Sequence, residues 1–330
     1  MNYQEKVERG ASIVIKDWMK LKSNEKLCIV TSNKHYSEAE ELKKFAEEIT
    51  NHVAIMLVKD EGKYVGVFFD ENEKIFDVYD AIIGATDYSI VTTKSADRAI
   101  KKGKKFLSLP LSTNNGMSML AFDFLTVDTE LSRIKAQILL KYIEKSSKIT
   151  VTTALGTHLE FSMKRRKPGF FNGTVKDGKG YASASVEVYI PIVETKTNGT
   201  LILDGSFGYI GKVEKPVRVE FKDGRIVSIE DNESGHILDQ HLKDYQDENM
   251  YVAAEFGIGL NPISKCNGDC YIEDESVYGT FHIGFGRNHA LGGKHEAKSH
   301  FDLVTCKPNI YFDNRLIMEE GEITIPEFRI

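Results

Sequence analysis

The order of strand-like and helix-like segments changes near residue 147, and this change limits the folds open to the chain. Before it, short apolar runs alternate with segments of helical periodicity such as His35–Ile49, where Ser37 is a plausible N-cap, and Lys94–Lys102. The apolar runs have the length of strands and are Lys26–Ser32, Val53–Val58, Tyr79–Ile83, Tyr88–Thr92 and Phe106–Pro110. This alternation predicts an α/β domain over residues 1–147, with a doubly wound parallel sheet.

After residue 147, strand-like runs follow one another with only short turns between them. The dipeptides Asp-Gly and Asp-Asn separate several of these runs, as is typical of hairpins. Leu125–Ser146 is a long amphipathic segment that we interpret as a helix linking two domains. Ser234–Tyr245 has helical periodicity, and Val252–Ile263 is a weaker helix candidate. Residues 148–330 are therefore predicted to form a β-rich α+β domain.

Composition excludes several classes of function. The net charge of -6 gives no support to nucleic-acid binding, which requires a basic surface. No apolar run approaches the length of a membrane span, and the charged N-terminal segment lacks the apolar core of a signal peptide. No glycine-rich phosphate-binding motif follows any predicted strand. We therefore expect a cytoplasmic protein with no nucleic-acid or membrane partner, and no nucleotide site.

Histidines and isolated carboxylates concentrate in the second half. Four of the nine histidines lie between His282 and His300, and His300-x-Asp302 places two potential ligands on one face of a strand. Glu187 and Glu255 each lie in an apolar run, where a carboxylate needs a partner or a metal ion. From these residues alone, His300 and Asp302 could equally lie on an exposed strand face, and His282 could be a hydrogen-bonded core histidine. Glu275, in an acidic run, is interpreted as solvated.

The second half resembles the aminopeptidase T and aminopeptidase S family of metallopeptidases. Its motifs are similar to four segments that occur here in the same order: Val186–Pro191, Ala254–Pro262, Gly279–Gly286 and Ser299–Val304. The resemblance places Glu187, Glu255, His282, His300 and Asp302 at the family's metal-ligand positions. It implies two divalent ions (Zn, Co or Mn), an aminopeptidase acting on peptides, and a homodimer.

The same resemblance assigns catalytic roles. Glu187 is expected to bridge the ions or to act as base for the attacking water. His289 stands where the family has its catalytic tyrosine, so it is expected to stabilise the oxyanion or to orient the substrate.

An alternative uses part of the same residue set. His282, His300 and Asp302 are two imidazoles and one carboxylate, the facial triad of non-haem Fe(II) oxygenases. Ring-cleaving dihydroxypyridine dioxygenases are similar to this peptidase family, and the absence of the tyrosine fits them. The hydrolase is the main hypothesis, because Glu187 and Glu255 have no place in an iron triad. The dioxygenase, with Fe(II) and a small-molecule substrate, is the alternative.

Overall fold

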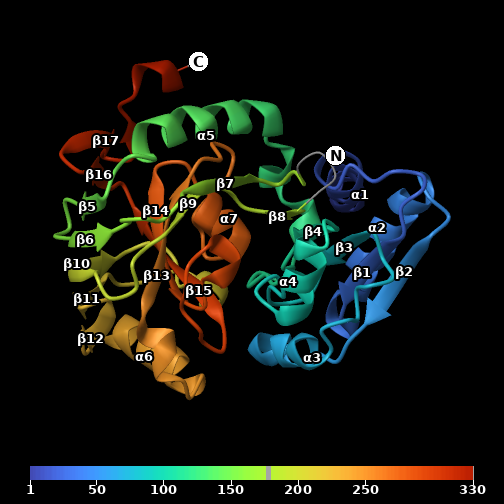
Figure 1. The fold of residues 1–330 in the computed structure, drawn as a ribbon, viewed down its shortest axis with the longest axis horizontal. Coiled ribbons are helices and arrows are strands. Elements are labelled where there is room, and N and C mark those ends of the chain that lie inside the picture. Colours follow the sequence, from blue (N-terminus) through green and yellow to red (C-terminus); the bar gives the residue numbers. More distant parts are fainter. Residues whose placement is uncertain (176–179, 330) are drawn as a thin grey trace. The chain divides into compact units, whose positions relative to one another are not determined.

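The structure is a computed structural model that describes residues 1–175 and 180–329, and its chain divides into two compact units (Figure 1). The first unit contains residues 1–129 and 171–185, and the second contains residues 130–170 and 186–330. The chain therefore passes between the units more than once, whereas the sequence predicted a single boundary at residue 147. The predicted fold class, a parallel α/β part followed by an antiparallel β-rich part, is confirmed.

The first unit is built on a five-stranded parallel sheet in the order β2-β1-β3-β4-β8. Its strands are β1 (Leu27–Thr31), β2 (Val53–Leu57), β3 (Ala81–Gly84), β4 (Lys105–Ser108) and β8 (Gly180–Ser183). The helices of this unit are α1 (Tyr3–Ile13), α2 (Tyr36–Glu47), α3 (Gly66–Glu71) and α4 (Lys94–Lys101). Because β1, β3 and β4 are buried throughout, they appear in the sequence as continuous apolar runs.

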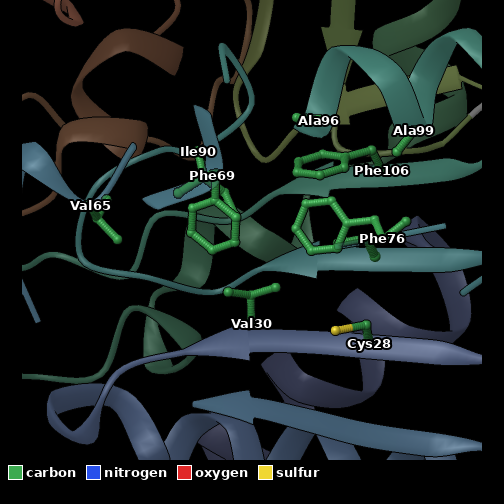
Figure 2. Close-up of a cluster of buried hydrophobic side chains, with 10 residues drawn as sticks. Cys28, Val30, Val65, Phe69, Phe76, Ile90, Ala96, Ala99 and Phe106 are labelled. Carbon is green, nitrogen blue, oxygen red and sulfur yellow. The ribbon is translucent and has the colours of Figure 1, made fainter. Parts of the chain in front are cut away.

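Aromatic and aliphatic side chains fill the core of the first unit (Figure 2). Phe76 stacks on Phe69 with ring centroids 5.6 Å apart and meets Phe106 edge-on at 5.9 Å. Cys28 points into the same cluster as a free thiol, and burial raises its pKa to about 12. Burial in apolar surroundings makes a thiol of this kind unreactive.

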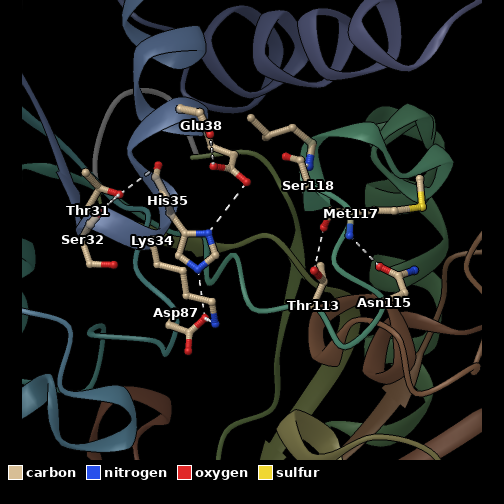
Figure 3. Close-up of polar contacts among 12 residues, drawn as sticks. Thr31, Ser32, Lys34, His35, Glu38, Asp87, Thr113, Asn115, Met117 and Ser118 are labelled. Atoms are coloured by element: carbon tan, nitrogen blue, oxygen red, sulfur yellow. Dashed lines mark hydrogen bonds and ion pairs between the residues drawn. The ribbon is translucent and has the colours of Figure 1, made fainter.

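A polar network lies where β1 and β3 end (Figure 3). The Nε2 atom of His35 lies 2.9 Å from Asp87, and Lys34 forms an ion pair with the same carboxylate at 2.6 Å. Glu38 approaches the other ring nitrogen of His35 at 3.8 Å. His35 is only 5% exposed, so this network joins two strand ends within the first unit.

The second unit contains two antiparallel sheets. One has eight strands in the order β12-β11-β10-β6-β5-β16-β17-β18, and the other has five in the order β15-β14-β13-β9-β7. The strands of the eight-stranded sheet are β5 (Lys148–Thr152), β6 (His158–Ser162), β10 (Asn198–Leu203), β11 (Val217–Lys222), β12 (Arg225–Ile229), β16 (Asn309–Phe312), β17 (Arg315–Glu319) and β18 (Glu322–Ile323). The strands of the five-stranded sheet are β7 (Gly169–Asn172), β9 (Val186–Pro191), β13 (Ala253–Gly259), β14 (Thr280–Gly286) and β15 (His300–Cys306). The helices are α5 (Thr129–Ile143), α6 (Glu233–Asp244) and α7 (Tyr271–Ser276).

The two faces of the five-stranded sheet have different neighbours. Phe256 on β13 packs against Phe161 of the eight-stranded sheet, with ring centroids 5.3 Å apart, so that side forms the core of a sandwich. The short helix α7 is packed against β13, β14, β15 and β9. Every residue of β13 and β14 is buried, so side chains on both faces of these strands are removed from water.

Three local predictions differ from the structure, and one strand was not predicted. Tyr88–Thr92 is not a strand but part of the connection between β3 and α4. The weak helix candidate Val252–Ile263 contains strand β13, because tertiary pairing on both sides overrides local preference. Ser37 lies inside α2, whose N-cap is His35. The strand β8 was not anticipated, because its four residues, Gly180–Ser183, form no apolar run.

None of the helices in residues 1–175 and 180–329 combines the length and the apolar character needed to cross a bilayer.

Candidate metal centre

Strand register brings the predicted ligands to one face of the five-stranded sheet. Glu255 on β13 lies opposite Gly284 on β14, and Gly284 lies opposite Asp302 on β15. His282 is two residues from Gly284 and pairs with Gly257. Residues that pair directly across antiparallel strands, or that lie two apart on one strand, point to the same face. Glu255, His282 and Asp302 therefore share a face.

The two remaining ligands join the same face at its ends. His300 is two residues from Asp302 and pairs with Gly286, and Glu187 on β9 pairs with Gly259 of β13. The even spacing along each strand thus collects all five predicted ligands from four adjacent strands. Phe256, Phe281 and Ile283 occupy the alternate positions and point to the opposite face, which explains the mixed pattern in the sequence.

Two glycines make this convergence possible. A Cβ atom on Gly257 would lie 1.8 Å from Nε2 of His282. A Cβ atom on Gly284 would lie 2.6 Å from Cε1 of His300 and 2.7 Å from Oδ1 of Asp302. Any side chain at either position would therefore occupy the space in which the ligand atoms meet. The glycines form a cradle under the cluster.

The ligand atoms form two overlapping groups. Glu187, Glu255 and His282 offer atoms within 4.8 Å of one another, and so do Glu255, His300 and Asp302. Within the first group, Nε2 of His282 lies 2.7 Å from Oε2 of Glu187. In the second, Nε2 of His300 lies 3.0 Å from Oε2 of Glu255 and 3.5 Å from Oδ1 of Asp302. Glu255 is common to both groups.

Burial and crowding of like charges control protonation in the cluster. Burial raises the pKa of Glu255 to about 7, although its hydrogen bond with His300 acts in the opposite direction. For His282, burial acts to lower the pKa, but the charge of Glu187 and the other carboxylates outweighs it and raises the pKa to about 9. Protonated imidazoles thus supply the positive charge that a bound cation would bring, and metal binding would release these protons.

The surroundings of the cluster suit metal ligation. The Nδ1–H group of His300 donates a hydrogen bond to the carbonyl oxygen of Arg287, 2.9 Å away, which leaves Nε2 free to bind an ion. The hydroxyl of Tyr271 donates to Oδ2 of Asp302. Oδ1 of Asp302 is buried and has no hydrogen-bond partner in the part of the chain that the structure describes. A buried set of carboxylates and imidazoles with these orientations fits a divalent cation.

Sequence reasoning missed two members of this site, Tyr271 and Glu275, both on α7. Glu275 is 4% exposed rather than solvated, and burial together with the charges of Glu187, Asp302 and Glu255 raises its pKa well above the usual range. The acidic run in which it lies has the composition of an exposed loop. Its burial depends on α7 covering the sheet, a long-range contact with no local signal.

The structure does not bring His289 and His295 to the cluster. His289 lies in a short 3-10 helix, His289–Leu291, where its side chain is 43% exposed and pairs with Glu296 at 2.9 Å. Nε2 of His295 forms a hydrogen bond with the carbonyl oxygen of Asn249, at 2.9 Å. The catalytic role predicted for His289 therefore has no geometric support among the described contacts.

Comparison with known proteins separates the two functional hypotheses. The sequence profile of the 2,5-dihydroxypyridine 5,6-dioxygenase family matches residues 122–325, more than half of the chain. The 2,5-dihydroxypyridine 5,6-dioxygenase of Pseudomonas putida is 25% identical over 150 residues, which span 41% of this chain and 41% of that enzyme.

Two solved structures share the fold. The 2,5-dihydroxypyridine dioxygenase of Pseudomonas putida superposes with a TM-score of 0.80 and 16% identity, and all of both chains is covered. Wild-type AmpT from Thermus thermophilus superposes with a TM-score of 0.71 and 13% identity, and 98% of this chain and all of AmpT are covered. At these identities the likeness shows the fold alone.

The prediction of an aminopeptidase is wrong. The family profile and the curated relative both name a dioxygenase, so the hydrolase and protease assignments are withdrawn together with zinc and cobalt as the expected metals. The resemblance to aminopeptidase T was correct for the fold. It misled on chemistry because a similar two-domain fold is found both in AmpT and in the dioxygenase.

Proposed function

Because the chain belongs to the 2,5-dihydroxypyridine 5,6-dioxygenase family, we propose that it is a non-haem Fe(II) dioxygenase that opens a dihydroxylated pyridine or a related ring. The observation that carries the proposal is the buried set of carboxylates and imidazoles on one sheet face, in a chain of this family. Dioxygenases of this type place both oxygen atoms in the product, so they need no external reductant.

We propose that Glu255, His300 and Asp302 hold the iron, with His282 supplying a second imidazole. The first three offer ligand atoms within 4.8 Å of one another, and His282 belongs to the adjoining group through Glu255. The triad suggested by the sequence, His282, His300 and Asp302, is thus extended by Glu255. Two imidazoles and a carboxylate are the usual set for Fe(II) that reacts with dioxygen.

Bound Fe(II) would supply the one-electron chemistry that the reaction of dioxygen with a ring requires. The protein's own residues orient the ligands and exclude water from them. Arg287 fixes the tautomer of His300 through its carbonyl oxygen. The burial of Glu187, Glu255, His282 and Asp302 keeps water away from the ligand atoms and strengthens their hold on a cation.

The test is anaerobic reconstitution with Fe(II), followed by oxygen uptake with 2,5-dihydroxypyridine. We expect uptake to require both iron and substrate, and isotopically labelled dioxygen to leave both labelled atoms in the product. Aminoacyl-p-nitroanilides serve as the counter-substrate. Release of nitroaniline without oxygen uptake would overturn the proposal.

Ligand variants test the residue assignment. His300→Ala and Asp302→Ala should lose iron and activity together, because each removes an atom of the compact group. Glu296→Gln is a matched control, since this exposed carboxylate pairs with His289 and belongs to neither group of potential ligands. Full iron content and activity in His282→Ala would show that His282 is not a ligand.

A further inference from the structure

Tyr271 is the first residue of α7 and contacts the ligand cluster through one atom. Its hydroxyl donates a hydrogen bond to Oδ2 of Asp302, and the tyrosine is only 8% exposed. The other carboxylate oxygen, Oδ1, lies 3.5 Å from Nε2 of His300 and faces the remaining ligand atoms. The two oxygens of Asp302 are therefore in different environments, one engaged by the protein and one directed at the site.

The ring of Tyr271 is held in place independently of that hydrogen bond. It stacks on Tyr209 with ring centroids 4.2 Å apart and an interplanar angle of 24°. Gly208 has a φ of 62°, and a Cβ atom there would lie 3.2 Å from Cδ2 of Tyr271 and 2.8 Å from the carbonyl oxygen of Asp302. The aromatic stack and the close backbone approach fix the hydroxyl before any metal binds.

We propose that Tyr271 is a positioning residue that makes Asp302 a one-oxygen ligand and so keeps a coordination position open. A carboxylate can bind a cation through one oxygen or through both, and the second mode occupies one more position. The hydrogen bond from Tyr271 engages Oδ2, so Asp302 offers Oδ1 alone. The inference rests on the proposed function, because an open position is useful only where substrate or dioxygen must approach the metal.

The hydrogen bond is strong enough for this role. A hydroxyl that donates to a buried carboxylate forms a charge-assisted bond, roughly twice as strong as a neutral one. If the hydroxyl is removed, Oδ2 is left buried without a partner, and a bound cation becomes the nearest group that can satisfy it. Tyr271→Phe should therefore convert Asp302 to two-oxygen binding.

The experiment compares Co(II)-loaded proteins, because the visible absorption of Co(II) weakens as its coordination number rises. For Tyr271→Phe we expect weaker visible absorption with metal still bound, and an oxygen uptake of the Fe(II) form reduced roughly 10- to 100-fold. Tyr209→Phe is the matched control, because it removes a hydroxyl from the same stacked pair and leaves Tyr271 bonded to Asp302. It should keep the spectrum and the activity of the original protein.

Two results would overturn the inference: an unchanged spectrum in Tyr271→Phe, or an equal change in Tyr209→Phe. If Tyr271→Phe does not fold, a crystal structure of the Co(II)-loaded original protein provides the test, and coordination by both oxygens of Asp302 contradicts us. Failure of the original protein to bind Fe(II) or Co(II) would instead contradict the proposed function, so the two failures are distinguishable.

Discussion

Two sheets in this molecule have fully buried central strands with different contents. In the parallel sheet of the first unit, the buried strands β1 and β3 consist almost entirely of aliphatic residues, with aromatic rings packed above them. In the antiparallel sheet of the second unit, the equally buried strands β13 and β14 carry Glu255, His282 and several glycines. Burial of ionisable groups costs free energy unless they are paired or bind a cation. We therefore expect the first sheet to contribute mainly to stability and the second to hold the proposed metal site.

The largest expected effect comes from adding one methyl group to each sheet. Gly257→Ala places a carbon 1.8 Å from Nε2 of His282, so we expect the metal content to fall to background. Gly84→Ala in β3 meets the side chain of Ile90 at 2.9 Å instead, and should cost about 1–3 kcal/mol while the metal remains bound. Metal analysis and urea unfolding measure both. Retained metal in Gly257→Ala would break the comparison.

A core truncation in the first unit should have the opposite pattern. Phe106→Ala removes a fully buried ring that contacts Phe76, and should destabilise the protein by about 3–5 kcal/mol. The metal content of the folded fraction should stay unchanged, because the proposed ligands lie in the second unit. Denaturant unfolding monitored beside metal analysis tests this. A parallel loss of metal would mean that the site depends on the core of the first unit.

Metal binding should change the hydrogen-exchange rates of the two units unequally. A ligand at about 100 times its Kd stabilises the state that binds it by about 2.7 kcal/mol. Hydrogen exchange should therefore slow in β13, β14 and β15 when Fe(II) or Co(II) is added, and should stay constant in β1 and β3. Equal protection of the strands of both units would show that the units open together, and would contradict a separate role for each sheet.

The smallest effect concerns pH and the first unit. Burial acts to lower the pKa of His35, but Asp87 and Glu38 outweigh it and raise the value above normal. The contribution of His35 to stability is thus fully present below its unfolded pKa of about 6.5 and is lost as the pH rises through the folded value.

The carboxylates of the same network behave in the opposite direction. Burial acts to raise the pKa of Asp87 and of Glu38, but their contacts with His35 and with neighbouring groups hold both values below normal. Their contribution is lost as the pH falls through the folded values. Urea unfolding of His35→Asn should show a flatter pH dependence between about pH 5 and 8 than the original protein. An unchanged pH profile would show that His35 does not contribute to the pH dependence of stability.

The parts of the site that depend on local sequence patterns could be predicted, and the parts that depend on long-range packing could not. Even spacing and charged residues in apolar strands marked the five residues as candidates, and only the family resemblance grouped them as predicted ligands. Glu275 and Tyr271 were not predicted as site residues, because the segment around them is acidic and has the composition of an exposed loop. Only the packing of α7 on the sheet buries them. His289 is the converse case: its motif position suggested a catalytic role, whereas the structure places its 43% exposed side chain beside Glu296.

The fold divides in the same way. Continuous apolar runs predicted β1, β2, β3 and β4, and periodicity predicted α2 and α6. Tyr88–Thr92 has a similar composition but lies beyond the last residue that pairs in β3. The edge strand β8 could not be anticipated, because it is specified by pairing with β4, about 75 residues earlier in the chain, rather than by an apolar run of its own.

That edge strand has a consequence for biosynthesis. The ribosome synthesises the chain from the N-terminus onwards, and each domain generally folds once all of it has emerged. Here β8 ends at Ser183, so the first unit cannot finish its sheet until β5 and β6, which belong to the second unit, have also been made. Nascent β4 therefore waits with an unpaired edge, and a fragment ending near residue 147 would keep that edge permanently.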